Sequence, residues 1–304
     1  MKDITHYIDI EKLTAPVNNL EAIVLLSTGK EEQALRDHFI DQVIINTNEE
    51  DTNKAKNIDF YIYTNKKKPN KFNTTYLEKI FKSVTYKFLS VPNNKDFYFH
   101  PHQVKNLTEA QLKFYDFTHG QKSGPNYSFF RILHDLKEYN TSLMLESDCF
   151  LKPGWINDTW NYTKHCNGLW VSGAKYSGTA RCDTDPLELL TKHINGGVCL
   201  YATGDYNFQQ FIKLMENFLI DVMEDFPAYP YDYIIPMMIW TYVNSEDTNY
   251  YQFGRYLEKY YFFNNLISNL SVELDSSLDP EEIFRLYKYK ILHKKPFSYK
   301  KFTE

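Results

Sequence analysis

Short apolar runs alternate along the chain with longer segments in which apolar residues recur every three or four positions. The short runs are rich in Val, Ile, Leu, Phe and Tyr, a pattern that predicts buried strands. The predicted strands cover residues 22–28, 42–46, 58–65, 85–91, 142–146, 168–174 and 196–202.

The segments between these runs show helical spacing. In the segment 125–139, Pro125 stands in the first turn, and Phe129, Ile132 and Leu133 follow at positions that share one helix face. Further helices are predicted over 29–40, 74–84, 154–165 and 207–224, and a short one near 108–115 within an otherwise irregular stretch at 92–120.

This alternation of strands and helices is typical of a mostly parallel sheet that is flanked by helices. We therefore expect an α/β fold of the Rossmann type. The 304 residues show no internal repeat and no low-complexity linker, so that one compact domain is expected.

Charge and composition exclude several classes of function. The net charge of −5 argues against a nucleic-acid-binding protein, because sequence-independent binding to phosphate backbones needs dense Lys and Arg patches. The sequence predicts no transmembrane segment and no secretory signal. The four cysteines, Cys149, Cys166, Cys182 and Cys199, form no CxxC pair, which fits reduced thiols in a cytoplasmic protein.

The strand predicted at 142–146 ends on two acidic residues. Glu146 and Asp148 stand at its carboxyl end, and Pro153 and Gly154 follow shortly after. Ligands of open α/β sheets bind beyond the carboxyl ends of the strands. Two carboxylates so close together repel each other unless a divalent cation lies between them, and such a cation can also bind a diphosphate. The alternative is that the two acids cap the next helix or face solvent.

The segment 123–155, SGPNYSFFRILHDLKEYNTSLMLESDCFLKPGW, resembles the core of GT-A-fold glycosyltransferases. In those enzymes a strand ends in an Asp-any-Asp motif that binds a metal ion. This chain has Glu-Ser-Asp instead, so Asp148 is the firmer metal ligand and Glu146 the departure from the pattern. The resemblance also implies that Ser147 lies against the nucleotide-sugar donor.

Two further segments fit this resemblance. The segment 193–206, HINGGVCLYATGDY, is similar to the Asn-Gly strand of the family that lines the sugar and acceptor side of the site, although a glycine-permitted bulge is an open alternative. In YPYDYIIPMM, Asp232 stands where inverting members carry the catalytic base, although it could equally cap a helix. The residues expected on the sugar and acceptor side are His193, Asn195, Gly196, Gly197 and Tyr231.

The carboxy-terminal sequence ILHKKP supplies a third ligand by the same resemblance. His293 would complete the metal shell, and Lys294 and Lys295 would contact the diphosphate of the donor. Imidazole is a suitable ligand for manganese, and ammonium groups balance a leaving diphosphate. The alternative is a basic surface tail with an incidental histidine.

The expected nucleoside contacts lie at the end of the first strand. The sequence LLSTGKEE is not a phosphate-binding P-loop, because Val24 stands where that motif has its first glycine and no Ser or Thr follows Lys30. The residues expected against the donor are instead Ser27, Thr28, Gly29, Gly124 and Asn126, with Tyr63 or Asn65 near the base.

Together these features predict a metal-dependent, GT-A-like hexosyltransferase. It would use Mn²⁺ or Mg²⁺ and move a hexose from a nucleotide sugar, with UDP-sugar the expected donor, to a hydroxyl acceptor such as a glycan. The single glycosyltransferase domain would span 1–304, with a nucleotide-sugar-binding half at about 20–150, an acceptor-side half at about 151–295 and a tail at 296–304. The alternatives are a nucleotidyltransferase acting on sugar phosphates and a non-catalytic carbohydrate-binding protein with the same fold.

Overall fold

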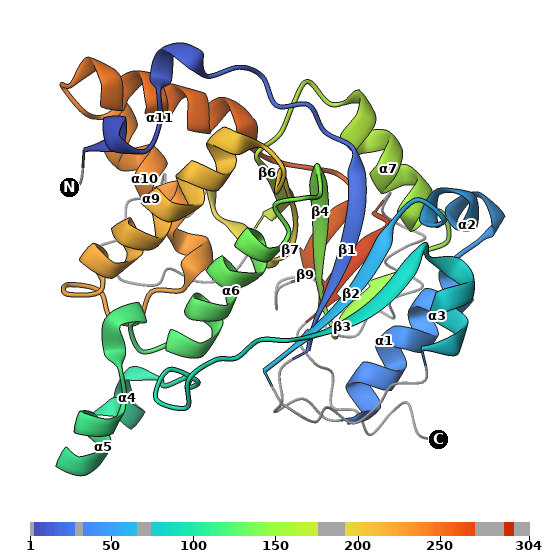
Figure 1. Cartoon of the computed structure of the whole chain (residues 1–304). Coiled ribbons are helices and arrows are strands. Elements are labelled where there is room, and N and C mark those ends of the chain that lie inside the picture. The colour runs from blue at the N-terminus through green and yellow to red at the C-terminus, as the bar shows by residue number, and fades with distance from the viewer. Residues whose placement is uncertain (1–2, 28–32, 66–73, 176–191, 271–288, 295–304) are drawn as a thin grey trace.

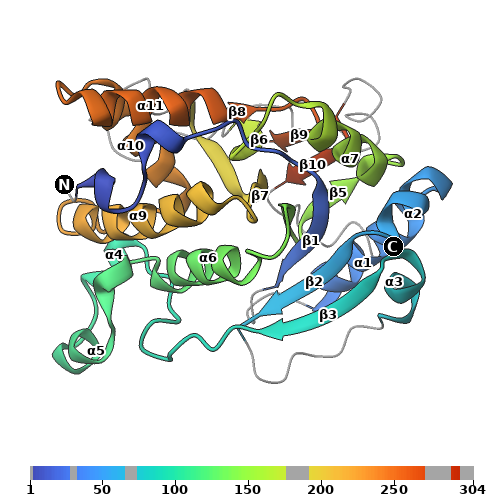
Figure 2. The ribbon, with the colours of Figure 1, turned by 45° about the horizontal axis from the view of Figure 1, so that its top comes forward.

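The computed structural model describes residues 3–27, 33–65, 74–175, 192–270 and 289–294. A twisted sheet runs through the middle of the protein, and helices cover both of its faces (Figures 1 and 2). This confirms the predicted α/β fold with a mostly parallel sheet flanked by helices.

The main sheet has seven strands in the order β3-β2-β1-β4-β7-β6-β8. Neighbouring strands run parallel except at β7, which is antiparallel to both β4 and β6. The chain moves outward from β1 to β2 and β3 and then returns to β4 on the other side of β1. The strand bounds are β1 Leu20–Ser27, β2 Asp59–Thr64, β3 Ser83–Phe88, β4 Thr141–Glu146, β6 Val171–Lys175, β7 Ile194–Tyr201 and β8 Tyr261–Phe263.

A second, smaller sheet of three strands lies beside the end of β4. It consists of β5 (Cys149–Leu151), β10 (Ile291–Lys294) and β9 (Ile267–Leu270), in the order β5-β10-β9. The central strand β10 pairs antiparallel with β5 and parallel with β9. This pairing places β10, which is far from β4 in the sequence, next to the turn that follows β4.

Alternate side chains of the central strands enter two separate cores. In β1, Ala22 and Val24 pack into the core under α6 and α9, whereas Ile23 and Leu25 pack into the core under α1 and α7. This division follows from the two-residue period of a strand that is buried on both faces. The helices on the first face are α6 Ser123–Asp135, α9 Tyr206–Val222, α10 Ile234–Val243 and α11 Thr248–Tyr260, and those on the second are α1 Gln33–Asn46, α2 Glu49–Ala55, α3 Thr75–Ile80 and α7 Trp155–His165 (Figure 1).

One predicted strand is wrong. Residues 42–46 form the last turns of α1, which continues to Asn46. The β-branched run in this segment favours a strand locally, but Phe39, Ile40 and Val43 are buried together while Ile45 is 73% exposed. Burial at this helical spacing gives the segment one packed face, and tertiary packing overrides its local preference. Smaller shifts occur at α3 and β3, where the helix ends earlier and the strand begins earlier than predicted.

A buried carboxylate joins α2 to α7. Asp51 is 0% exposed and accepts hydrogen bonds from the backbone N–H groups of Gly154 (2.8 Å), Ile156 (2.9 Å) and Asn157 (2.8 Å) at the first turn of α7. It also accepts the backbone N–H of Asn48 in a capping box at the start of α2. The start of a helix concentrates unpaired N–H groups and partial positive charge, so a carboxylate from another helix satisfies both.

The stretch predicted to be irregular, 92–120, contains two short helices, α4 (Pro101–Val104) and α5 (Glu109–Phe114). They lie away from the sheet at one end of the molecule (Figures 1 and 2). Among the described residues, no helix has both the length and the apolar character that crossing a bilayer would require.

Candidate metal and ligand site

The two predicted acidic ligands flank a tight turn between the two sheets. Glu146 is the last residue of β4, Ser147 and Asp148 form the turn, and Cys149 begins β5. The strand ends on a carboxylate because its buried run stops there, and the chain leaves the main sheet for the small one. Both acids therefore lie at the carboxyl-terminal edge of the main sheet, beside the point where the strand order reverses between β1 and β4.

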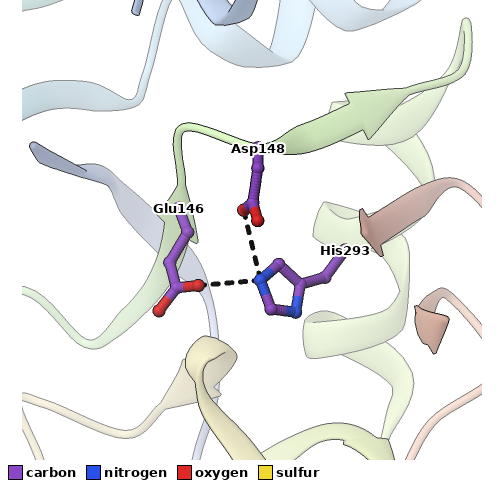
Figure 3. Close-up of side chains that lie close together, drawn as sticks. All are labelled: Glu146, Asp148 and His293. Carbon is purple, nitrogen blue, oxygen red and sulfur yellow. Dashed lines mark ion pairs between the residues drawn. The ribbon is translucent and has the colours of Figure 1, made fainter. Parts of the chain in front are cut away.

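The third predicted ligand reaches the same place through β10. His293 lies opposite Cys149 in the β5–β10 ladder. Its Nε2 atom lies 2.7 Å from Glu146 Oε2 and 3.1 Å from Asp148 Oδ1. Figure 3 shows both carboxylates directed at this one ring nitrogen. Strand pairing thus unites the predicted group Glu146, Asp148 and His293, although the histidine lies far from the acids in the sequence.

The electrostatics of this cluster call for a cation. Burial by itself would lower the pKa of His293, but the negative charges of Glu146 and Asp148 outweigh it and raise the pKa to about 10. The side chains of His293 and Asp148 are only 7% and 15% exposed, so water screens their interaction weakly. Two carboxylates at this position need positive charge, which either a protonated imidazole or a metal ion can supply.

The residues fit a divalent metal ion. One ring nitrogen carries at most one proton, so it cannot donate a full hydrogen bond to both carboxylates. Asp148 Oδ1 is buried, and apart from the shared Nε2 atom at 3.1 Å it has no hydrogen-bond donor in the described part of the chain. One ligand atom from each of the three residues lies within 4.8 Å of the others. Two carboxylates and an imidazole form a donor set that suits Mn²⁺, and the oxygen ligands also suit Mg²⁺.

Strand β7 closes the other side of this cluster. Asn195 is buried, and its side-chain amide nitrogen lies 2.7 Å from His293 Nδ1. The side-chain oxygen of Asn195, Oδ1, accepts the backbone N–H of Gly197 at 3.1 Å. A Cβ atom added at Gly197 would lie 1.9 Å from Glu146 Oε1, a distance that no real contact allows. A larger residue here would force the Glu146 side chain to move, so the glycine preserves the space that this carboxylate occupies.

Substituting Gly197 with alanine is therefore expected to displace the Glu146 carboxylate and to weaken Mn²⁺ binding by about 10-fold, as for the loss of an oriented ligand. Isothermal titration of the purified variant with MnCl₂ measures this change. Gly173→Ala is the control, since a Cβ atom on this neighbouring strand, β6, would meet Ile194 and Cys199 and not Glu146. Equal Mn²⁺ affinity of the Gly197 variant and the unaltered protein would contradict the steric argument.

A pocket of about 420 Å³ opens beside the acidic cluster. Ser27, Thr64 and Glu146, the last residues of β1, β2 and β4, all line it. Its apolar wall includes Phe129, whose ring stacks on Tyr231 with a centroid separation of 4.0 Å. A cavity of this size, lined by apolar and aromatic residues with a few polar groups, suits a small organic ligand.

A third carboxylate lies in this pocket, away from the cluster. Asp96 accepts hydrogen bonds from the side-chain amide of Asn65 at 2.9 and 3.0 Å, and both residues line the pocket. Asn65 directly follows β2, which is two strands away from β4 in the sheet. Adjacent strands lie about 4.8 Å apart, so the backbones at Asn65 and at the end of β4 are separated by on the order of 10 Å.

Asp232 forms a buried pair with a second predicted residue. His193 Nε2 lies 3.2 Å from Asp232 Oδ2, and the two side chains are 0% and 12% exposed. The backbone N–H of Gly196 approaches the same carboxylate oxygen at 3.5 Å. Asp232 thus contacts β7 at Gly196, the residue before the one that faces Glu146.

Comparisons with known proteins identify only distant likenesses. No family model matches the chain, and no curated protein matches it. Among solved structures, mouse xyloside xylosyltransferase 1 shares 11% identity over 91% of this chain and 99% of its own, with a TM-score of 0.49. An active-site mutant of LgtC shares 11% identity over 91% of this chain and 88% of its own, with a TM-score of 0.48.

A third likeness is to the glycosyltransferase GlyE of Streptococcus pneumoniae TIGR4. It shares 12% identity over 91% of this chain and 54% of its own, with a TM-score of 0.41. This chain therefore spans about half of the GlyE chain. TM-scores below 0.5 at such identities do not by themselves assign a family or an activity, so the residues of the site carry the functional argument.

The structure brings most of the residues predicted from the sequence to this region. Besides the metal cluster, the pocket lining includes Ser27, Tyr63, Gly124, Ser147 and Tyr231. The predicted donor contacts Thr28, Gly29 and Lys295 lie outside the described residues. Lys294 ends β10 opposite Leu270, and only its backbone is described.

Asn126 has a structural role that the sequence did not indicate. It is 0% exposed. Its amide donates to the carbonyl oxygens of His119 and Tyr229 and accepts the backbone N–H of Tyr231. All of these contacts are internal, which differs from the expected contact with the donor. Asn126 instead fixes the loop that places Tyr231 in the pocket wall.

Sequence reasoning missed part of the pocket wall altogether. Leu89, Asp96, Phe97 and Tyr98 belong to the connection after β3 and line the pocket. No strand-end rule or motif indicates a ligand site in such a segment. The only available signal was an acidic residue next to a run of aromatic residues at 96–99.

Proposed function

We propose that this protein is a metal-dependent glycosyltransferase of the GT-A type. It would transfer a hexose from a nucleotide sugar, with a UDP-sugar as donor, to a hydroxyl acceptor, and one domain would carry both substrates. The observation that carries this proposal is the convergence of His293 on Glu146 and Asp148, two acids that line a pocket at the ends of β1, β2 and β4. The sequence resemblance at 123–155 supports the same conclusion.

Asp148, Glu146 and His293 would hold the divalent ion. When bound, the ion would offset the negative charge of the diphosphate and so favour its departure as a leaving group. Asp148 would be the central ligand of the three, because its side chain is only 15% exposed and its Oδ1 atom has no contact but that with His293 Nε2 within the described chain. Ser147, between the two acids, would contact the donor from the turn.

The distribution of charge in the pocket orients the proposed donor. Asp96 would repel a diphosphate, so the phosphates belong at the acidic cluster, where the cation compensates the charge. The uncharged nucleoside then lies toward Asn65 and Asp96, whose polar atoms can bond its hydroxyl or N–H groups. The apolar side of the pocket, including Phe129 and Met144, would pack against the rings of the nucleoside.

Asp232 would act on the acceptor. If the reaction inverts the anomeric configuration, Asp232 would take the proton of the attacking hydroxyl as general base. His193 would hold the carboxylate in place through the contact of 3.2 Å. If the reaction retains the configuration, Asp232 would orient the acceptor or the sugar instead.

A thermal-shift panel of nucleoside diphosphates and nucleotide sugars, with and without MnCl₂, tests the proposal. We expect uridine compounds with Mn²⁺ to stabilise the protein by about 2.7 kcal/mol at a ligand concentration 100 times the Kd. The same compounds in EDTA should give little stabilisation, because the diphosphate then meets uncompensated carboxylates. An unchanged melting temperature with every nucleotide in the presence of Mn²⁺ would refute the proposal.

A further inference from the structure

Both ring nitrogens of His293 have polar contacts, and Nδ1 contacts a residue of the main sheet. Nε2 faces the two carboxylates, whereas Nδ1 lies 2.7 Å from the side-chain amide of Asn195 in β7. Nδ1 is the only other ring atom that forms hydrogen bonds. Asn195 therefore determines the orientation of a ligand that arrives on a different sheet.

We infer that the segment Asn195–Gly197 forms the outer shell of the metal site and that Asn195 is a positioning residue for His293. This inference rests on the proposed metal-dependent function and departs from the expectation that the segment lines the sugar side. Two independent contacts carry it. The Asn195 amide holds His293, and the bare backbone of Gly197 leaves the space in which Glu146 lies.

The chemistry of imidazole specifies what Asn195 must supply. A ring that gives its Nε2 lone pair to a cation carries its proton on Nδ1 and needs a hydrogen-bond acceptor there. Asn195 presents its amide nitrogen to Nδ1, which suits a ring whose proton lies on Nε2 between the carboxylates. A half-turn of the amide places the oxygen at Nδ1 instead, which suits any ring that carries a proton there, whether the ring is protonated at both nitrogens or binds a cation through Nε2.

The same half-turn affects a backbone donor in the wall of the site. In the present orientation of the amide, the side-chain oxygen Oδ1 of Asn195 accepts the N–H of Gly197 at 3.1 Å. Turning the amide removes that acceptor from the Gly197 N–H.

The test compares Mn²⁺ affinity of two nearly isosteric variants, Asn195→Leu and Asn195→Asp. Without nucleotide present, Asn195→Leu should bind Mn²⁺ about 10- to 100-fold more weakly, as is usual when the partner of a ligating histidine is lost. Asn195→Asp should bind at least as tightly as the unaltered protein, because its carboxylate accepts from Nδ1–H and from the Gly197 N–H at once. Isothermal titration and the electron paramagnetic resonance signal of free Mn²⁺ measure both.

Recovery by aspartate separates a hydrogen-bonding role from a packing role. Asn18→Leu is the matched control: it removes another buried asparagine, which bonds Thr141 and the Leu169 carbonyl oxygen, and should leave Mn²⁺ affinity unchanged. If Asn195→Leu does not fold, Asn195→Ala takes its place in the comparison with Asn195→Asp.

The possible outcomes distinguish this inference from the proposed function. If the unaltered protein binds no Mn²⁺, the metal-dependent function itself fails. If it binds Mn²⁺ but the leucine or alanine variant binds equally well, only the role of Asn195 is overturned. The inference is also overturned if Asn195→Asp loses as much Mn²⁺ affinity as Asn195→Leu. An acceptor for Nδ1–H would then not be what Asn195 supplies.

Discussion

Asp148→Asn is expected to lower Mn²⁺-dependent turnover of a nucleotide sugar by about 100- to 1,000-fold, which corresponds to a loss of about 3 to 4 kcal/mol of transition-state stabilisation. The substitution keeps the volume of the side chain but removes the negative charge from the most buried acidic ligand. Glu146 and His293 would remain as a simple ion pair, in which one N–H faces one carboxylate. Such a pair is balanced in charge and needs no metal ion. Hydrolysis of UDP-sugars, followed by release of UDP as MnCl₂ is varied, measures the effect.

The control for this variant is Asp247→Asn. Asp247 caps α11 by accepting the N–H groups of Asn249 and Tyr250, and asparagine replaces aspartate at such a position with little change in stability. This control should keep full turnover. Metal-dependent turnover of the Asp148 variant close to that of the control would exclude Asp148 as the principal ligand. Binding of nucleotide sugar without turnover in every form would support the carbohydrate-binding alternative.

Asp51→Ala is expected to cause the largest loss of stability, about 3 kcal/mol or more. The alanine variant leaves three N–H groups at the start of α7 without their acceptor, and each buried, unpaired group costs about 1 to 3 kcal/mol before water or local relaxation compensates. Asp51→Asn keeps one acceptor oxygen and should lose about half as much. Urea unfolding followed by circular dichroism gives both differences from the shift in midpoint.

Asp247→Ala serves as the comparison, since it removes a cap on the surface of the same protein. Exposed N-caps contribute about 1 kcal/mol, so the loss at Asp51 should be clearly greater. Equal losses at the two positions would mean that solvent replaces the carboxylate of Asp51 as readily as it does at the surface. The hydrogen bonds of Asp51 between α2 and α7 would then contribute no more to the free energy of unfolding than an ordinary helix cap.

The parts of the site that lie within one stretch of sequence were predictable. A buried run that stops at Glu146, with Asp148 two residues later, indicates a strand end, and strand ends are where open sheets bind ligands. The periodicity that identified β1 and α6 reflects burial on both faces of the sheet and on one face of a helix. The error at 42–46 shows the limit of this reasoning, because a β-branched run reads as a strand until its packing partners are known.

Contacts between distant segments could not be derived from spacing. The resemblance to a known family suggested His293 as a ligand, but the pairing of β10 with β5 that delivers it depends on the whole fold. The contact of Asn195 with the histidine ring depends on a third element, β7. Asp96 lies in the connection after β3, whose path over the pocket is set by packing and has no local pattern.

The arrangement of β10 has a consequence for assembly of the protein. The two acids are separated by one residue in the chain and can come together early, whereas the imidazole arrives only when β10 has docked against β5. A chain in which this last strand has not paired would present two repelling carboxylates and no complete coordination set. Tight cation binding thus requires the fully folded protein. A bound ion would in turn stabilise the docking of β10 against the turn after β4.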